Sequence, residues 1–169
     1  GDGEVALAVE TSSDVADLAG NALASSVASS TITVDNTAPT LSIGAPSATF
    51  TKSGPVTFTV TYSGADSVTL ADGDITVNTT GTAAGTAAVT GAGNTERTVT
   101  ISGITGDGTL SISVAQGSAA DTAGNLAAAQ GPSSTFSADN TGPTVTVNTL
   151  NSKNTSPALT GTVSDTGGS

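Results

Sequence analysis

The amino-acid sequence repeats itself after 104 residues, and this repeat restricts the possible folds more than any other feature. Residues 17–21 (DLAGN) return as residues 121–125 (DTAGN), and residues 34–40 (VDNTAPT) return as residues 138–144 (ADNTGPT). Both matches are free of gaps and share one displacement, so the spacer between them has the same length in the two copies. Such a match indicates a true tandem repeat, in which each unit is one structural module.

The repeat divides the chain into three parts. Residues 1–37 correspond to the last third of a repeat, residues 38–141 make up a whole repeat, and residues 142–169 open a third one. The segment GDG at residues 1–3 returns at residues 106–108, one residue later than the other matches. The alternating pattern of the third repeat matches that of the whole repeat only after a small shift in alignment. We therefore expect the third repeat to belong to a related but different subtype. We therefore expect a piece of a longer tandem array, with any signal or anchor lying outside it.

Apolar residues alternate with Thr and Ser along the whole repeat, as they do on half-buried β-strands. Val56, Phe58, Val60 and Tyr62 alternate with threonines, which places one apolar and one hydroxyl face on a strand. Gly, Asn, Asp and Pro interrupt the pattern every 8–12 residues, a spacing typical of a sandwich. The strands predicted lie near residues 40–44, 55–63, 67–70, 74–79, 83–90, 96–102, 108–115 and 133–139. The fold expected is all-β, and its size is that of an immunoglobulin-like β-sandwich.

The composition excludes several classes of protein. The 169 residues include 32 Thr and 21 Gly but no Cys or His, which leaves no disulfide framework, zinc finger, haem ligand or Ser-His-Asp triad. The longest apolar runs, of about five residues, are too short for a membrane-spanning helix, so we expect no membrane insertion in this segment. The net charge of −11 repels phosphate backbones, so we expect no nucleic-acid partner.

Three motifs give the repeat a family resemblance. They are VDNTAPT at residues 34–40, GDGTLSISV at residues 106–114 and DTAGN at residues 121–125. Together they resemble the Ig-like repeats of large bacterial adhesins and biofilm proteins. Residues 155–163 (TSPALTGTV) look like the opening of another repeat class in the same proteins. The resemblance implies immunoglobulin-like Greek-key β-sandwiches in tandem, an extracellular place on the bacterial cell surface, and Ca²⁺ at the domain junctions.

Acidic residues are predicted to gather at the ends of the central repeat. A chain that enters a sandwich at one end (the proximal end) and leaves at the other (the distal end) brings alternate loops together at each end. The residues expected around the proximal end are Asp2, Asp35, Asn36, Asp66 and Asp121. Those expected around the distal end are Asp72, Asp74, Asp107, Asp139 and Asn140, with Asp165 from the following repeat.

These clusters suggest a metal but also have a simpler interpretation. Carboxylates that converge without Lys or Arg repel one another unless a cation intervenes, and Ca²⁺ takes six to eight oxygen ligands. The spacing is not that of an EF-hand loop. In the simpler interpretation, Asp121 forms a turn, and the junction residues end a strand ahead of Pro39 or Pro143.

The sequence favours a structural function over catalysis. A glycosidase would need two carboxylates in a cleft and usually aromatic platforms, and the chain has only three Phe and one Tyr. A Ser-Lys nucleophile pair is formally possible at Lys52 and Ser53, but these residues are adjacent in a turn. An intramolecular isopeptide bond would need a buried Lys beside an acid, whereas Lys52 and Glu96 are expected at the surface. We therefore expect a non-enzymatic spacer or stalk of a surface adhesin, whose partners are the neighbouring repeats of its own chain.

Two alternatives remain open. In the first, copies of the chain assemble into a fibre or surface layer and complete one another's sandwiches by strand addition. Residues 1–37 and 142–169 supply only 65 residues, fewer than the 104 of a whole repeat, which weakens this alternative. In the second, the repeats are accessory modules of a secreted enzyme.

Overall fold

Residues 40–138 form two four-stranded β-sheets. The computed structural model describes residues 1–11 and 14–165, and its only helical element is a single 3₁₀ turn, η1 (Asp72–Asp74). The first sheet has the order β10-β11-β7-β5, and the second has the order β6-β14-β12-β9. The first consists of β5 (Thr40–Ile43), β7 (Val56–Ser63), β10 (Ala84–Thr90) and β11 (Glu96–Thr105). The second consists of β6 (Phe50–Thr51), β9 (Ile75–Thr79), β12 (Gly108–Val114) and β14 (Phe136–Ala138).

The two sheets enclose one apolar core. On β7 every second side chain is buried, and β11 and β12 add further buried Val, Ile and Leu side chains. Phe58 of the first sheet packs against Phe136 of the second, with 6.2 Å between ring centroids. Burial of these side chains supplies most of the driving force for the fold. The predicted all-β fold is confirmed, since the alternation in the sequence coincides with the buried face of each long strand.

The strand boundaries differ from the predicted ones in two segments, and two short strands were not predicted. The segment predicted as residues 67–70 keeps only β8 (Ser67–Val68), which pairs with β13 (Ala119–Ala120). The segment predicted as residues 133–139 shortens to β14, because the Ser133 hydroxyl accepts the Ile112 N–H at 3.0 Å. The short strands β6 and β13 were not predicted, because two residues carry no periodic pattern.

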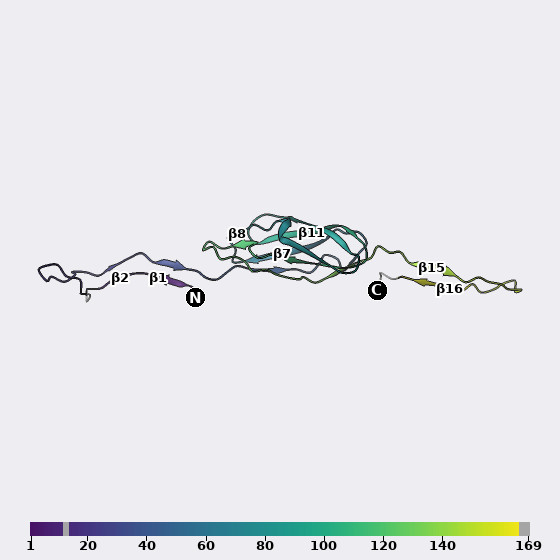
Figure 1. Cartoon of the computed structure of the whole chain (residues 1–169), viewed down its shortest axis with the longest axis horizontal. Coiled ribbons are helices and arrows are strands. Elements are labelled where there is room, and N and C mark those ends of the chain that lie inside the picture. The colour runs from purple at the N-terminus through teal and green to yellow at the C-terminus, as the bar shows by residue number, and fades with distance from the viewer. Residues whose placement is uncertain (12–13, 166–169) are drawn as a thin grey trace.

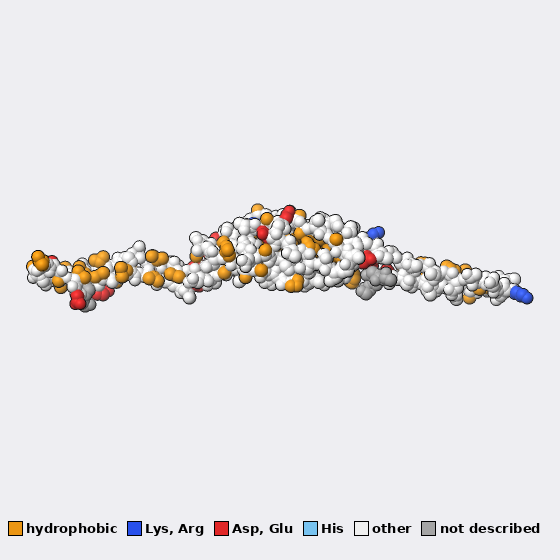
Figure 2. Space-filling view, in the orientation of Figure 1, with side chains coloured by type: hydrophobic (Ala, Val, Ile, Leu, Met, Phe, Trp, Pro, Cys, Tyr) orange, Lys and Arg blue, Asp and Glu red, His pale blue; other side chains and the backbone are white. Residues whose placement is uncertain are grey.

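Two-stranded ribbons flank the sandwich and leave it at opposite ends (Figure 1). The N-terminal ribbon consists of β1 (Gly3–Val5) paired with β4 (Ile32–Val34), followed by β2 (Ala8–Val9) paired with β3 (Val27–Ala28). The C-terminal ribbon pairs β15 (Thr144–Val147) with β16 (Gly161–Ser164). All of these strand residues are exposed, and apolar side chains lie along both ribbons (Figure 2).

The N-terminal ribbon repeats the register of β12 and β14. Gly3 is paired with Val34, and Gly108 is paired with Ala138 at the equivalent place in the sandwich. The isolated bridge Ala16–Ala22 likewise recurs as Ala120–Leu126, 104 residues further on.

The C-terminal ribbon repeats the register of β5 and β7. Val145 is paired with Val163 as Leu41 is paired with Tyr62. The internal repeat of the sequence is therefore also a repeat of the backbone pairing.

Candidate functional site

The carboxylate of Asp107, in the turn between β11 and β12, holds the segment that leaves the sandwich. Its Oδ1 accepts a hydrogen bond from the backbone N–H of Asn140 at 2.6 Å, and its Oδ2 accepts one from the Thr141 hydroxyl. The Asn140 side-chain amide donates to the Gly106 carbonyl at 2.7 Å. The Thr141 N–H donates to Asp139 Oδ1 at 3.1 Å. These bonds fix the outgoing chain to the last distal turn, and we call this arrangement the clip.

The same clip closes the N-terminal ribbon. Asp2 Oδ1 accepts the Asn36 N–H at 2.7 Å, and Asp2 Oδ2 accepts the Thr37 hydroxyl. The Asn36 side-chain amide donates to the Gly1 carbonyl at 3.4 Å, and the Thr37 N–H donates to Asp35 Oδ1 at 2.9 Å. Each bond of the clip in the sandwich thus has a counterpart one repeat earlier.

A second motif, the turn at residues 121–125, lies at the proximal end and is also repeated. Asp121 Oδ1 accepts the Asn125 N–H at 2.8 Å, and Asp121 Oδ2 accepts the Asn125 side-chain amide at 2.8 Å. Asp17 and Asn21 form the same pair of bonds, at 2.9 and 2.8 Å, in the N-terminal ribbon. The carboxylate thus closes its own turn, as the simpler interpretation of the sequence predicts.

The proximal end of the sandwich contacts the preceding ribbon through this turn. The Asn125 side-chain amide donates to the Asp35 carbonyl at 3.0 Å, which links the turn at residues 121–125 to the clip of the ribbon. Asp66 Oδ2 accepts the Thr122 N–H at 2.8 Å and the Thr122 hydroxyl at 2.6 Å. A hollow between ribbon and sandwich is lined by Asp2, Gly3, Thr33, Val34, Asp35, Thr37, Gly64, Asp66 and Asp121.

The predicted proximal residues are therefore brought together. Asp2, Asp35, Asp66 and Asp121 line one hollow, and Asn36 takes part in the clip beside it. Among residues 1–11 and 14–165, however, no group of three or more acidic side chains is arranged to hold a metal ion. Both carboxylate oxygens of Asp2 and of Asp121, and Oδ2 of Asp66, accept hydrogen bonds within the fold. Calcium at the junction stays a prediction.

Hydrogen bonding favours the ionised form of these carboxylates. The Thr141 hydroxyl, and next the Asn140 N–H, lower the pKa of Asp107 below its ordinary 3.8. Thr37 and then Asn36 lower the pKa of Asp2 in the same way, and desolvation and then the Asp121 charge oppose this shift. The Asn125 side chain lowers the pKa of Asp121.

The predicted position of Asp72 and Asp74 at the distal end is wrong. Asp74 lies beside the last residue of β12, because its carbonyl accepts the Ala115 N–H at 2.9 Å, whereas Asp107 precedes the first residue of β12. Asp72 Oδ1 accepts the Val89 N–H at 2.6 Å, near the proximal end of β10. The prediction counted residues 67–70 as a strand that crosses the sandwich. Because β8 is two residues long and pairs only with β13, the chain stays at the proximal end until β9 begins.

The remaining distal residues lie where they were expected. Asp139 and Asn140 belong to the clip with Asp107. Asp165 follows Ser164, which is paired with Thr144 just beyond the clip. The sandwich and the C-terminal ribbon thus place acidic residues on both sides of the distal junction.

Sequence reasoning missed residues whose partners are set by tertiary structure. The Arg97 guanidinium, in a side chain only 9 % exposed, donates to the carbonyls of Gly93, Glu96 and Val68 at 2.6–2.9 Å and so joins two proximal loops. The Tyr62 hydroxyl donates to Ser118 Oγ at 3.0 Å inside the core, and burial raises the pKa of Tyr62. The available signal for the first of these contacts was the single Arg of the sequence, which lies within a predicted strand.

The hydroxyls of Thr37 and Thr141, which complete the two clips, were also overlooked. The signal for them was present in the sequence, since a Thr follows the Asp-Asn pair in both copies of the repeat.

Comparison of the chain with protein-family models, with curated proteins and with solved structures gave no match in any of the three. In the part of the chain that the structure describes, no helix has the length and apolar character to cross a membrane.

Proposed function

We propose that the chain is a structural spacer, a stalk module of a bacterial cell-surface adhesin, built from immunoglobulin-like Greek-key β-sandwich repeats in tandem. The strand order supports the immunoglobulin-like assignment. Taken in chain order as A (β5), B (β7), D (β10) and E (β11), the first sheet reads A-B-E-D. The second reads A′-G-F-C, with β6 as A′, β14 as G, β12 as F and β9 as C, and its β6–β14 pair is parallel.

The repeated clip is the observation that carries the proposal. In both copies an Asp carboxylate binds the outgoing segment to the turn before strand F. The chain therefore leaves each repeat at a fixed position on its distal end. The ribbons leave the sandwich at opposite ends (Figure 1), which lets successive repeats extend in one direction. A module of this kind sets the distance and direction between its neighbours in the chain, and this function requires no catalytic group.

The place on a bacterial surface rests on the resemblance of the sequence motifs. The absence of Cys, the 32 Thr residues and the net charge of −11 are consistent with a hydrated extracellular stalk. The Thr and Ser side chains of β7 and β11 face outward, so this surface presents many hydroxyl groups and few charged groups to the solvent.

The reach of a displayed ligand tests the spacer function. Bacteria would display a small binding domain on one, two or four copies of residues 38–141, and on Gly-Ser linkers of equal residue number as the matched control. We expect adhesion to a coated bead through a grafted polymer layer to rise with copy number, and to rise less for the flexible linkers, whose span grows only as the square root of length. Equal adhesion by both series would contradict the proposal.

Calcium at the junctions is part of the proposal as a separate prediction. Calorimetry of the whole chain with millimolar Ca²⁺ and with excess chelator tests it, because an ion that binds only the folded state raises the unfolding temperature. Identical unfolding temperatures in the two buffers would contradict a calcium site at the junctions, and the hydrogen-bonded clip would then be what stabilises them.

A further inference from the structure

One side chain of the sandwich reaches across the proximal junction to the preceding repeat. The Asn125 side-chain amide donates to Asp121 Oδ2 at 2.8 Å within its own turn, and to the Asp35 carbonyl at 3.0 Å on the other side of the junction. Among residues 1–11 and 14–165, no other hydrogen bond joins residues 1–37 to residues 38–141. The contact between the two repeats therefore depends on this amide more than on any other polar group.

The acceptor of this bond is held in place by the clip of the ribbon. The Thr37 N–H donates to Asp35 Oδ1 at 2.9 Å, and the Asn36 N–H donates to Asp2 Oδ1 at 2.7 Å. These bonds fix the backbone on the C-terminal side of the Asp35 carbonyl. The carbonyl therefore points in one direction relative to the ribbon.

The donor is held in place by the proximal loops of the sandwich. The Asn125 N–H donates to Asp121 Oδ1, and the Thr122 N–H of the same turn donates to Asp66 Oδ2 at 2.8 Å. The Asp66 carbonyl in turn accepts the Asn94 side-chain amide. The bond across the junction thus joins two parts that are each fixed by hydrogen bonds of their own.

Pro39 gives the junction a second point of contact. Pro39 is buried, and an added Cβ on Gly64 would lie only 3.8 Å from its Cα. Gly64 follows β7 with a φ of +76°, so a left-handed turn that favours Gly packs against the incoming chain. One contact alone would leave the ribbon free to pivot, whereas contacts on two different loops restrict its direction.

The residues on both sides of the junction belong to the internal repeat. Three pairs lie 104 residues apart: Asn21 and Asn125, Asp35 and Asp139, and Pro39 and Pro143. A repeat therefore carries the donor at its proximal end and the acceptor at its distal end, and successive repeats can make the same contact.

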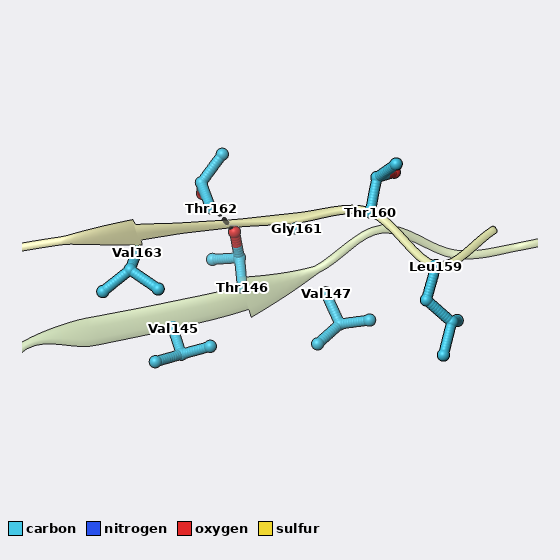
Figure 3. A pocket seen from close by; sticks show the side chains of 8 residues that line it. All are labelled: Val145, Thr146, Val147, Leu159, Thr160, Gly161, Thr162 and Val163. Carbon is cyan, nitrogen blue, oxygen red and sulfur yellow. Dashed lines mark hydrogen bonds between the residues drawn. The ribbon is translucent and has the colours of Figure 1, made fainter.

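The repeat that follows the sandwich begins in the same way as the sandwich does. Its strands β15 and β16 are paired in the register of β5 and β7. The valines of this ribbon point to one side, and the Thr146 and Thr162 hydroxyls contact each other at 2.6 Å on the other side (Figure 3). Pro143 directly precedes β15, as Pro39 directly precedes β5. The distal junction thus has the same entry segment as the proximal one.

We propose that the Asn125 amide, which we call the latch, holds the proximal end of a repeat against the clip of the preceding repeat and so sets the direction between them. The inference rests on the repeat assignment of the proposed function. Asp2, Asp35, Asp66 and Asp121 line the adjoining hollow, so a neutral donor is required at position 125. A carboxylate there would donate no hydrogen and would repel its neighbours. Asn125 is in this sense a positioning residue.

The distance between two spin labels on the whole chain, measured by electron–electron resonance in the presence of chelator, tests the latch. Because the protein has no Cys, Glu4→Cys and Thr61→Cys place one label on β1 and one on β7, both at exposed positions. We expect a single narrow distance in the parent chain. Asn125→Ala removes the donor, and Asn125→Asp also adds a charge beside Asp121. Both variants should lose the narrow distance, the second more completely.

Three controls separate the latch from a general loss of structure. Asn21→Asp breaks the equivalent bonds of the turn one repeat earlier, where the amide donates to Asp17, and should keep the narrow distance. Gly106→Ala strains the distal turn of the sandwich and should also keep it. A second label pair, Glu4→Cys with Ser30→Cys, reports on the ribbon alone and should be unchanged by either Asn125 variant.

A narrow distance that survives both Asn125 variants would overturn the inference, as would a broad distribution in the parent chain or equal broadening by Asn21→Asp. The spacer proposal is tested separately by the reach of displayed ligands. If only the latch fails, adhesion should still rise with copy number more than it does for flexible linkers. If only the spacer function fails, the two adhesion series coincide while the label distances still respond to the Asn125 variants.

Discussion

At the scale of single residues, the acidic side chains of this protein act as hydrogen-bond acceptors that fix turns and linkers. Asp107 uses both carboxylate oxygens on the segment that leaves the sandwich, and Asp121 uses both on its own turn. An ionised acceptor makes a stronger bond than a neutral one, so these contacts depend on the carboxylates being charged.

The first prediction concerns acid. Because hydrogen bonds hold the pKa of Asp107 and Asp121 below 3.8 in the folded chain, the unfolded chain takes up these protons at a higher pH. The stability that they contribute is present above about pH 4 and is lost as the pH falls through the lowered values. The urea midpoint of unfolding should therefore be flat from pH 7 to about 5 and fall below about 4. Asp107→Asn should lower the midpoint at pH 7 and reduce the dependence on acid.

Glu96→Gln is the control for that variant, since Glu96 is an exposed acid on β11 with no part in the clip. It should leave the acid dependence as it is. An Asp107→Asn profile that runs parallel to the parent profile at every pH would show that the clip carries no charge-dependent stability.

The second prediction concerns the buried pair of hydroxyls. Tyr62 and Ser118 are 4 % and 2 % exposed, and their hydroxyls are 3.0 Å apart. Tyr62→Phe leaves the Ser118 hydroxyl without its partner and should cost about 1–3 kcal/mol in the free energy of unfolding. Ser118→Ala in the Tyr62→Phe background should restore part of this loss, so a denaturant double-mutant cycle should give a coupling energy of about 1 kcal/mol. Additive effects would contradict the assigned bond.

At the scale of elements, the long strands follow from the sequence and the short ones do not. Alternating Val, Phe and Tyr on β7 predicted a half-buried strand, and the strand is there with the expected buried face. The two-residue strands β6 and β13 pair with strands more than 50 residues away in the sequence, so no local sequence pattern predicts them.

The candidate site divides in the same way. The clip residues are repeated in the sequence, so their importance could be inferred, although their hydrogen-bonding roles could not. The end of the sandwich at which Asp72 and Asp74 lie depended on whether β8 crosses the sheet. That outcome is decided by the pairing of β8 with β13, and local propensity does not encode it.

The third prediction concerns the turn between β11 and β12, which carries Asp107. Gly106 has a φ of +71°, and an added Cβ would lie 2.1 Å from the Thr82 carbonyl oxygen. Gly106→Ala should therefore lower the free energy of unfolding by about 2 kcal/mol or more, from left-handed strain and steric overlap together. Gly73→Ala is the matched control, because Gly73 has ordinary φ and open space around it. Equal denaturation midpoints for the two variants would contradict the described turn.

At the scale of the whole molecule, a cooperative core is joined to two ribbons that lack one. The buried residues of the apolar core lie between Val56 and Ala138, and Leu41, Ile43 and Ala48 pack against them partly buried. The strand residues of the ribbons are exposed. Two-stranded ribbons are marginal by themselves, whereas a sandwich opens only by global unfolding. The stability of the chain should thus be very uneven along its length.

The fourth prediction follows from that unevenness. In dilute solution, amide hydrogen exchange followed by mass spectrometry should show slow exchange in β7, β11 and β12, and fast exchange in β1, β4, β15 and β16. Uniform protection along the chain at high dilution would contradict this division.

The central claim is that successive repeats are held end to end by the clip. Small-angle scattering of polypeptides with two, three and four copies of residues 38–141, each in Ca²⁺ and in chelator, tests it most directly. The account predicts a constant cross-section and an equal increase in maximum dimension with each added copy, and Asp107→Asn in every copy should shorten the average. A maximum dimension that grows as the square root of copy number, unchanged by Asp107→Asn, would show freely jointed repeats and contradict the account.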